Sequence, residues 1–172
     1  MLVAIDGYNF IKQSPELRRL EQVELQKARD GLIQKLIRYK RIKGHSITVV
    51  FDGRQEGGLS GHRERSGGIE VIFSRRGEKA DDVLKRLATE KRDGILLVTS
   101  DREIAQFAGK KGAKVIPVSE FGEKMEMAEY YSLKGNKGGN ESLDHPVAPD
   151  KKGPSRRLSK SQRKTMAAAK KL

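Results

Sequence analysis

Cysteine and tryptophan are both absent from the 172 residues of the chain. Without cysteine there is no disulfide, no thiolate ligand for zinc or an iron–sulfur cluster, and no thiol nucleophile. A chain without disulfides fits a reducing compartment, so we expect a cytoplasmic protein. Aromatic residues are also few, five phenylalanines and four tyrosines, and the sequence offers no obvious platform on which nucleic-acid bases would stack.

Long hydrophobic runs are missing as well. No apolar run approaches the roughly 20 residues that a membrane-spanning helix needs. The first apolar run ends at Asp6, too early for the core of a signal peptide, so we expect neither a membrane protein nor a secreted one. The three histidines (His45, His62 and His145) lie in predicted turns or near the C-terminus, at no spacing typical of metal ligands.

Positive charge is present in excess. The chain has 36 Lys+Arg and 23 Asp+Glu, a net charge of +13, and residues 134–172 alone hold 11 basic and 3 acidic residues. This segment lacks periodic large apolar residues, so we predict a disordered or partly helical basic tail after a folded domain of residues 1–133. Nucleic acid is the favoured partner of such a tail, because each neutralised phosphate releases counterions. A tail that only solubilises the protein is the alternative.

Apolar periodicity predicts strands that alternate with helices in the folded part. Short β-branched runs predict strands at residues 2–5, 46–51, 69–73, 95–99 and 114–118, the last at a sheet edge because of Pro117. Amphipathic spacing predicts helices at residues 21–43, 80–91, 101–111 and 119–131, and Ser14-Pro15-Glu16 is typical of a helix start. The fold class that follows is α/β, a three-layer α/β/α sandwich around a mostly parallel sheet. The order of the strands is not predicted.

Acidic residues follow each of the first four predicted strands. Asp6, Asp52 and Asp101 come after the first, second and fourth strands, and Asp81 and Asp82 open the helix after the third. The carboxyl ends of parallel strands share one edge of a sheet, so we expect these side chains to lie together. Taken singly, each acid also has an ordinary structural explanation, as a turn residue or a helix cap.

Such a group of carboxylates has a chemical consequence. Two carboxylates about 4 Å apart repel by roughly 4 kcal/mol at an effective dielectric constant of about 20, so a cluster raises its own pKa values or binds a cation. Oxygen ligands favour Mg²⁺ or Mn²⁺ over zinc, and such an ion activates water and offsets the charge of a phosphate. In a basic protein, we expect such a site to act on the phosphate backbone of a nucleic acid. The alternatives are a noncatalytic RNA-binding module and a hydrolase of small phosphoesters, whose usual covalent form needs an acid where Tyr8 stands.

Basic residues flank the same predicted edge in two loops. The loop before the acidic helix contains Arg75, Arg76 and Lys79. The glycine-rich stretch from Gly53 to Gly68 contains Arg54, Arg63 and Arg65. We predict that both loops contact RNA, the second as a mobile flap, since its glycines have neither the Walker nor the dinucleotide-binding spacing. A solvated loop is an equally open interpretation of the first.

Four short motifs together resemble one family. They are Asp6-Gly7-Tyr8-Asn9, Val49-Val50-Phe51-Asp52, Ala80-Asp81-Asp82 and Thr99-Ser100-Asp101. Their order and spacing over residues 1–131 are similar to those of the NYN domains, which are PIN-like ribonucleases, and most similar to the YacP-like branch. The resemblance implies a PIN-like sandwich and a metal-dependent endoribonuclease. The YacP-like branch further implies a role in mRNA decay and association with the ribosome.

The resemblance also implies roles for individual residues. Asp6 and Asp101 match the central metal-binding aspartates of the family, and Asp81 matches the acid that opens the helix after the third strand, with Asp82 beside it. Asn9 and Ser100 match polar residues that orient the carboxylates or the phosphate. The predicted catalytic residues are thus Asp6, Asn9, Asp81, Ser100 and Asp101, and the predicted metal ligands are Asp6, Asp52, Asp81, Asp82 and Asp101.

Overall fold

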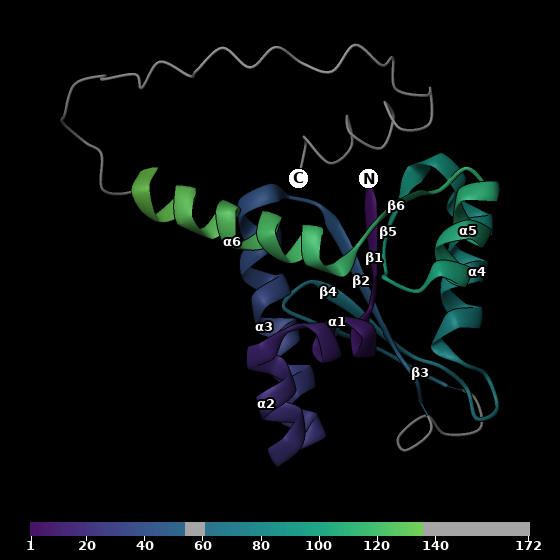
Figure 1. The fold of residues 1–172 in the computed structure, drawn as a ribbon, viewed down its shortest axis with the longest axis horizontal. Helices are drawn as coiled ribbons and strands as arrows, with labels where there is room; N and C mark the ends of the chain where they lie inside the picture. The colour runs from purple at the N-terminus through teal and green to yellow at the C-terminus, as the bar shows by residue number, and fades with distance from the viewer. Residues whose placement is uncertain (54–60, 136–172) are drawn as a thin grey trace, which may run out of the picture.

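The structure, a computed structural model, describes residues 1–53 and 61–135 (Figure 1). The chain order is β1 (Leu2–Asp6), α1 (Gly7–Gln13), α2 (Pro15–Val23), α3 (Leu25–Lys43), β2 (Ser46–Phe51), β3 (His62–Ser66), β4 (Ile69–Phe73), α4 (Ala80–Lys91), the 3₁₀ turn η1 (Arg92–Gly94), β5 (Ile95–Val98), α5 (Arg102–Lys110), β6 (Lys114–Ile116) and α6 (Val118–Gly135). Arg54 and residues 136–172 lie outside the described residues, so the predicted disordered or partly helical tail stays a prediction, as does a domain boundary after Leu133.

One sheet carries the fold. Its strand order is β3-β4-β2-β1-β5-β6, and every neighbouring pair is parallel except β3 and β4. The predicted α/β class with a mostly parallel sheet is confirmed, and β6 is an edge strand, as Pro117 indicated. The parallel pairing puts the carboxyl ends of β4, β2, β1 and β5 at one edge, which we call the carboxyl edge.

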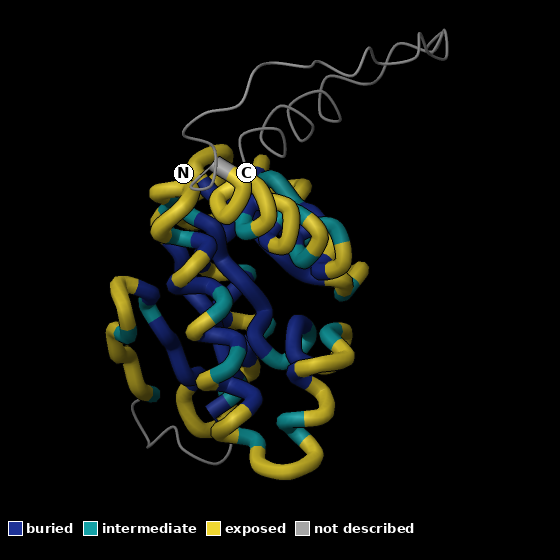
Figure 2. The backbone as a smooth tube through the Cα atoms, turned by 90° about the vertical axis from the view of Figure 1, so that its left-hand side faces the viewer, coloured by how far each residue is buried: buried dark blue, intermediate teal, exposed yellow. Residues whose placement is uncertain are grey.

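Helices cover both faces of the sheet and complete the three layers (Figure 1). Alternate residues of each strand enter different cores: Val3 and Ile5 of β1 pack with α1, α2, α3 and α6, whereas Ala4 packs with α4 and α5. The buried backbone in Figure 2 accordingly runs through the strands, with exposed turns around it. In the described part of the chain, no helix has the length and apolar character needed to cross a membrane.

A hairpin replaces the predicted mobile flap over part of its length. His62–Ser66 forms β3, antiparallel to β4, and Gly67 and Gly68 connect the two strands with φ values of 56° and 82°. Two positive φ values in a two-residue connection are typical of hairpin turns and favour glycine. The prediction of a loop was wrong for His62–Ser66, because the polar residues of an edge strand do not show the apolar pattern used to find strands, and RNA contact by Arg63 and Arg65 stays a prediction.

Two helix predictions also need correction. The helix predicted at residues 21–43 is divided at Glu24, which is extended with φ −161°, between α2 and α3. Both helices bury apolar residues in the same core, so the periodicity continues across the break. The short helix α1 was not predicted, and the last helix starts at Val118 and extends to Gly135.

Candidate active site at the carboxyl edge

Asp6 occupies the centre of the carboxyl edge. It is the last residue of β1, which lies between β2 and β5, and its Oδ1 accepts a hydrogen bond of 3.1 Å from the backbone N–H of Asn9. Asp6 therefore ends a strand and caps α1 at once. The helix starts this early because Gly7 has no side chain: a Cβ there would lie 2.3 Å from the ring of Phe51.

The Asp6 carboxyl has a raised pKa. Only 8% of the residue is exposed, and burial is the largest cause of a rise from 3.8 to about 6. The Asn9 amide and Lys12 lower this pKa, whereas the negative charges of Asp81 and Asp101 raise it further. Three carboxylates from three separate elements thus interact electrostatically at this edge, as the strand-end pattern predicted.

Asp101 caps the helix that follows β5. Its Oδ1 accepts hydrogen bonds from the backbone N–H groups of Glu103, at 2.7 Å, and Ile104, at 3.1 Å. The buried Thr99 supports this turn, because its Oγ1 accepts a bond of 3.1 Å from the N–H of Asp101. Asp101 Oδ1 therefore acts as a helix cap, which is the ordinary structural role that the sequence also allowed for this residue.

The other acids have different surroundings. Asp81 lies in the first turn of α4 and is half-buried, and Asp82, the next residue, is exposed. Asp82 Oδ2 accepts a bond of 3.2 Å from the N–H of Lys79 and so caps α4. Asp52 follows β2 and is half-buried. The carboxylates that raise the pKa of Asp6 are those of Asp81 and Asp101.

Carboxylate oxygens are suitable donors for Mg²⁺ or Mn²⁺. Asp6 and Asp101 both cap a helix with Oδ1, and within the described residues the Oδ2 atom of each accepts no hydrogen bond. Capping therefore leaves one oxygen of each side chain for another ligand. As these side chains are oriented, however, residues 1–53 and 61–135 contain no group of three or more Asp, Glu or His side chains arranged to hold a metal ion.

A hydrogen-bonded chain joins the two polar residues that the sequence singled out. Ser100 Oγ donates to Gln13 Oε1 at 3.0 Å, and Gln13 Nε2 donates to Asn9 Oδ1. Ser100 Oγ also accepts a bond of 3.2 Å from the N–H of Val118, at the start of α6. Gln13 was missed by sequence reasoning, because only the structure brings the end of α1 beside the loop after β5.

Tyr8 connects α1 to a buried arginine of α3. Arg29 is only 2% exposed, its Nε donates to the Tyr8 hydroxyl at 3.0 Å, and its guanidinium lies 5.3–5.7 Å from the ring centres of Tyr8, Phe51 and Phe73. Phe51 and Phe73 are the last residues of β2 and β4. These cation–π contacts stabilise the ends of β2 and β4 at the carboxyl edge. Sequence reasoning missed Arg29, which looks like any other basic residue of an amphipathic helix.

The predicted RNA-contacting residues lie at different distances from this edge. Arg75, Arg76 and Lys79 are exposed in the loop between β4 and α4, at the carboxyl edge. Arg63 is opposite Ile72, near the same end of β4, and has Glu70 3.6 Å away. Arg65 is opposite Glu70, toward the other end of β4. The structure thus brings the first loop to the acids and leaves Arg65 apart from them.

The sequence model of the YacP-like NYN domain matches residues 3–171 of the chain. The chain belongs to this family. All four motifs and the whole carboxyl edge fall inside the matched range, and the NYN domain has a nuclease-like fold. The predicted membership of the YacP-like branch is confirmed.

Relatives of this NYN domain come from Bacillus subtilis. The uncharacterized protein YacP of strain 168 is 37% identical over 87 residues, which is 51% of this chain and 51% of the relative, so the match spans about half of that protein. The crystal structure of Rae1 (YacP) aligns with a TM-score of 0.66 at 30% identity and covers 80% of each chain. A mutant of Rae1 (YacP) aligns with a TM-score of 0.67 at 26% identity, covering 83% of this chain and 86% of the other.

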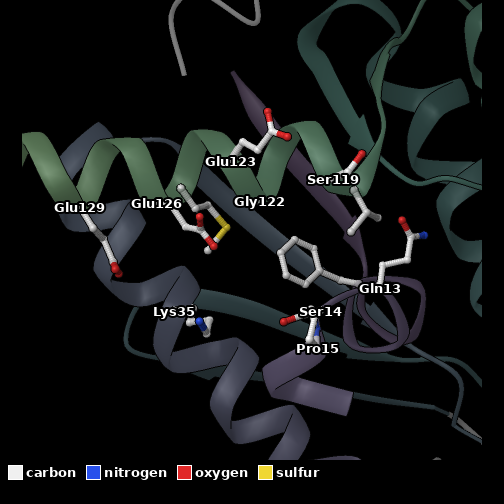
Figure 3. Close-up of a pocket in the computed structure, with 12 residues that line it drawn as sticks. Gln13, Ser14, Pro15, Lys35, Ser119, Gly122, Glu123, Glu126 and Glu129 are labelled. Carbon is white, nitrogen blue, oxygen red and sulfur yellow. The ribbon is translucent and has the colours of Figure 1, made fainter. Parts of the chain in front are cut away.

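The NYN domain has a pocket of about 180 Å³ beside the carboxyl edge, between α6 and the helices α1, α2 and α3. Its lining includes Gln13, Ser14, Lys35 and three glutamates of α6, Glu123, Glu126 and Glu129 (Figure 3). The pocket has a single lysine beside its three glutamates, whereas the acids of the carboxyl edge have the exposed cations Arg75, Arg76 and Lys79 next to them to bind a phosphate backbone. The carboxyl edge is therefore the better candidate for chemistry on RNA.

Proposed function

We propose that the protein is a metal-dependent endoribonuclease that cleaves single-stranded RNA at the carboxyl edge. The observation that carries the proposal is the buried Asp6, whose pKa is raised to about 6 by burial, with Asp81 and Asp101 adding to the rise. Because burial and two neighbouring negative charges disfavour the ionised Asp6 carboxylate, a bound cation would stabilise it. The nuclease-like fold of the family supports the same conclusion.

Asp6, Asp81 and Asp101 would hold a Mg²⁺ or Mn²⁺ ion, with Asp52 and Asp82 in support. When bound, such an ion supplies an activated water and offsets negative charge on the phosphate. The exposed Arg75, Arg76 and Lys79 would bind and orient the RNA backbone beside the acids.

Asn9 and Ser100 would keep the acidic turns in position through their shared partner Gln13. We extend the proposal to a cytoplasmic enzyme of mRNA decay that acts on the ribosome. This part rests on the family and on the basic character of the chain.

Metal removal tests the proposal most directly. We expect the purified protein to cut a labelled, unstructured RNA internally in Mn²⁺ or Mg²⁺ and to lose this activity in EDTA, with recovery when excess Mn²⁺ is added back. The measurement is the rate at which shorter fragments appear on a denaturing gel. Fragments that accumulate equally in EDTA would exclude a metal-dependent reaction.

A noncatalytic RNA-binding module is the second candidate. It is favoured by the helix-capping bonds of Asp6, Asp82 and Asp101 and by the lack, in the described ranges, of side chains arranged to hold a metal. Tight, salt-sensitive RNA binding without cleavage in Mn²⁺ would support this module and exclude the nuclease.

Replacement of Gln13 by alanine tests the bridge between α1 and the loop after β5. We expect about a tenfold fall in the maximal cleavage rate, because Asn9 and Ser100 lose their common partner, with RNA affinity unchanged. Since Gln13 is exposed, the free energy of unfolding should fall by less than about 1 kcal/mol. Single-turnover kinetics at saturating protein separate the two effects.

Gln34→Ala is the matched control for this prediction, since Gln34 is also an exposed glutamine in a helix but lies on α3. Equal rates for both variants would mean that Gln13 has no positioning role.

A further inference from the structure

An apolar patch is exposed on one side of α6, the helix that ends the described part of the chain. Met127 and Tyr130 are each 50% exposed, whereas Phe121, Met125 and Ala128 of the same helix are buried in the core. Glu123, Glu126, Met127 and Tyr130 together line a shallow hollow. We call these four residues the outer face of α6.

The charge of this face is opposite to that of the protein as a whole. Glu129 pairs with Arg38 at 2.8 Å, but within the described residues Glu123 and Glu126 form no salt bridge. In Figure 3, Glu126 and Glu129 project from α6 toward α3, whereas Glu123 projects away from α3, so Glu123 and Glu126 lie at opposite margins of the outer face. Two carboxylates beside exposed apolar side chains suit a partner that is both cationic and amphipathic, and they repel RNA.

We propose that this partner is the C-terminal segment of the same chain, residues 158–172. In a helical arrangement, Leu158, Met166, Ala169 and Leu172 share one side. No acidic residue occurs after Asp150. The same segment contains five basic residues, Lys160, Arg163, Lys164, Lys170 and Lys171. The apolar side packs on Met127 and Tyr130, and the cations face Glu123 and Glu126.

The connection is long enough for this contact. The outer face lies directly before Gly135, where α6 ends, and 22 residues separate Gly135 from Leu158. An extended connection of that length reaches about 75 Å, whereas Tyr130 is only about 8 Å along the helix axis from Gly135. Tethering raises the effective concentration of the segment to the millimolar range, so a weak contact is sufficient.

Docking on α6 has a consequence for nucleic-acid binding. The docked segment places part of its positive charge against glutamates, so RNA must compete with the outer face of α6 for the tail. Weakening the docked state should therefore strengthen RNA binding. The docking itself does not depend on the proposed nuclease activity, and a test in the absence of RNA and metal separates the two.

The test uses the lack of native cysteine in the full-length chain. A nitroxide spin label on Thr165→Cys, with ¹⁵N-labelled protein, reports which backbone amides come close to the tail. We expect strong, selective broadening of the amide signals of Glu123, Met127 and Tyr130, independent of protein concentration. The double change Met127→Ser with Tyr130→Ser should reduce that broadening at least fivefold and increase RNA affinity about threefold. Val23→Ser, which removes an apolar side chain on α2 that is 74% exposed, should change neither.

Three results would overturn the proposal. Broadening centred on the turns around Asp6 and Asp101 would place the tail on the carboxyl edge instead. Broadening found only between labelled and unlabelled molecules in a mixture would assign the contact to a second copy of the chain. Weak broadening spread over the whole surface, unchanged in the double variant, would mean that the tail has no site on the folded domain.

Discussion

Asp6→Asn is expected to abolish RNA cleavage and, above about pH 6, to make the folded domain more stable. The variant removes the central charged oxygen of the carboxyl edge, so we expect a fall in cleavage rate of about a thousandfold, the upper end for losing one preorganised electrostatic group. Asparagine keeps the Oδ1 acceptor for the Asn9 amide, so the cap of α1 is retained.

The sign of the stability change follows from the raised pKa. In the unfolded chain Asp6 ionises near pH 3.8, whereas in the folded protein it ionises only near pH 6. Between these values the folded state holds a proton that the unfolded state has released, so stability falls as the pH rises. The stability lost by ionising Asp6 in the folded protein is therefore zero below about pH 4 and reaches its full value above about pH 6, with an upper limit of about 3 kcal/mol.

Chemical denaturation of both proteins at pH 4 and pH 8 measures this cost. The stability of Asp6→Asn should exceed that of the wild type at pH 8 and equal it at pH 4. Asp93→Asn is the control: Asp93 is exposed in η1, before β5, at the opposite edge of the sheet. That variant should retain full cleavage and show no comparable gain. A large loss of stability in Asp6→Asn at pH 8 would mean that the negative charge of Asp6 stabilises the folded domain, which would contradict the raised pKa of Asp6.

Gly7→Ala is expected to destabilise the folded domain strongly, because the added methyl group would overlap the ring of Phe51. Its Cβ would lie 2.3, 2.6 and 2.9 Å from three ring atoms of Phe51, closer than real Cβ contacts. The Phe51 ring stacks on the ring of Phe73, with the two ring centres 5.6 Å apart, and the Arg29 guanidinium packs against it. The Phe51 ring therefore has little freedom to move. We expect a loss of about 3 kcal/mol in the free energy of unfolding, the upper end for overpacking.

This substitution should also disturb the site. Displacing the start of α1 moves the Asn9 amide away from Asp6, so cleavage should fall even at temperatures where the variant is folded. Thermal unfolding followed by circular dichroism measures the first effect. Gly122→Ala in α6 is the matched control, because nothing lies within 4 Å of its added Cβ, and it should gain about 0.5–1 kcal/mol. Equal stability of the two variants would contradict the contact with Phe51.

Local patterns predicted the individual elements well. Buried strands such as β2 and β5 are apolar almost throughout, and α4 repeats its apolar residues at helical spacing, so both patterns are visible in short windows of sequence. The edge strand β3, HRERS, has no such pattern, because its polar side chains are exposed to solvent. The Gly67-Gly68 pair before an apolar strand was the signal that indicates a hairpin.

By itself, the sequence determined the α/β class and the presence of an acid after each of four strands, at the strand end or at the start of the next helix, because side-chain periodicity and turn chemistry are properties of neighbouring residues. Only the tertiary structure decided that β1 lies between β2 and β5, that Asp6 is buried where Asp81 and Asp101 act on it, and that Gln13 joins Asn9 to Ser100. These features depend on which strands pair and which helices share a face. Such pairing is settled by the burial of apolar surface between distant segments, which no short window of residues contains.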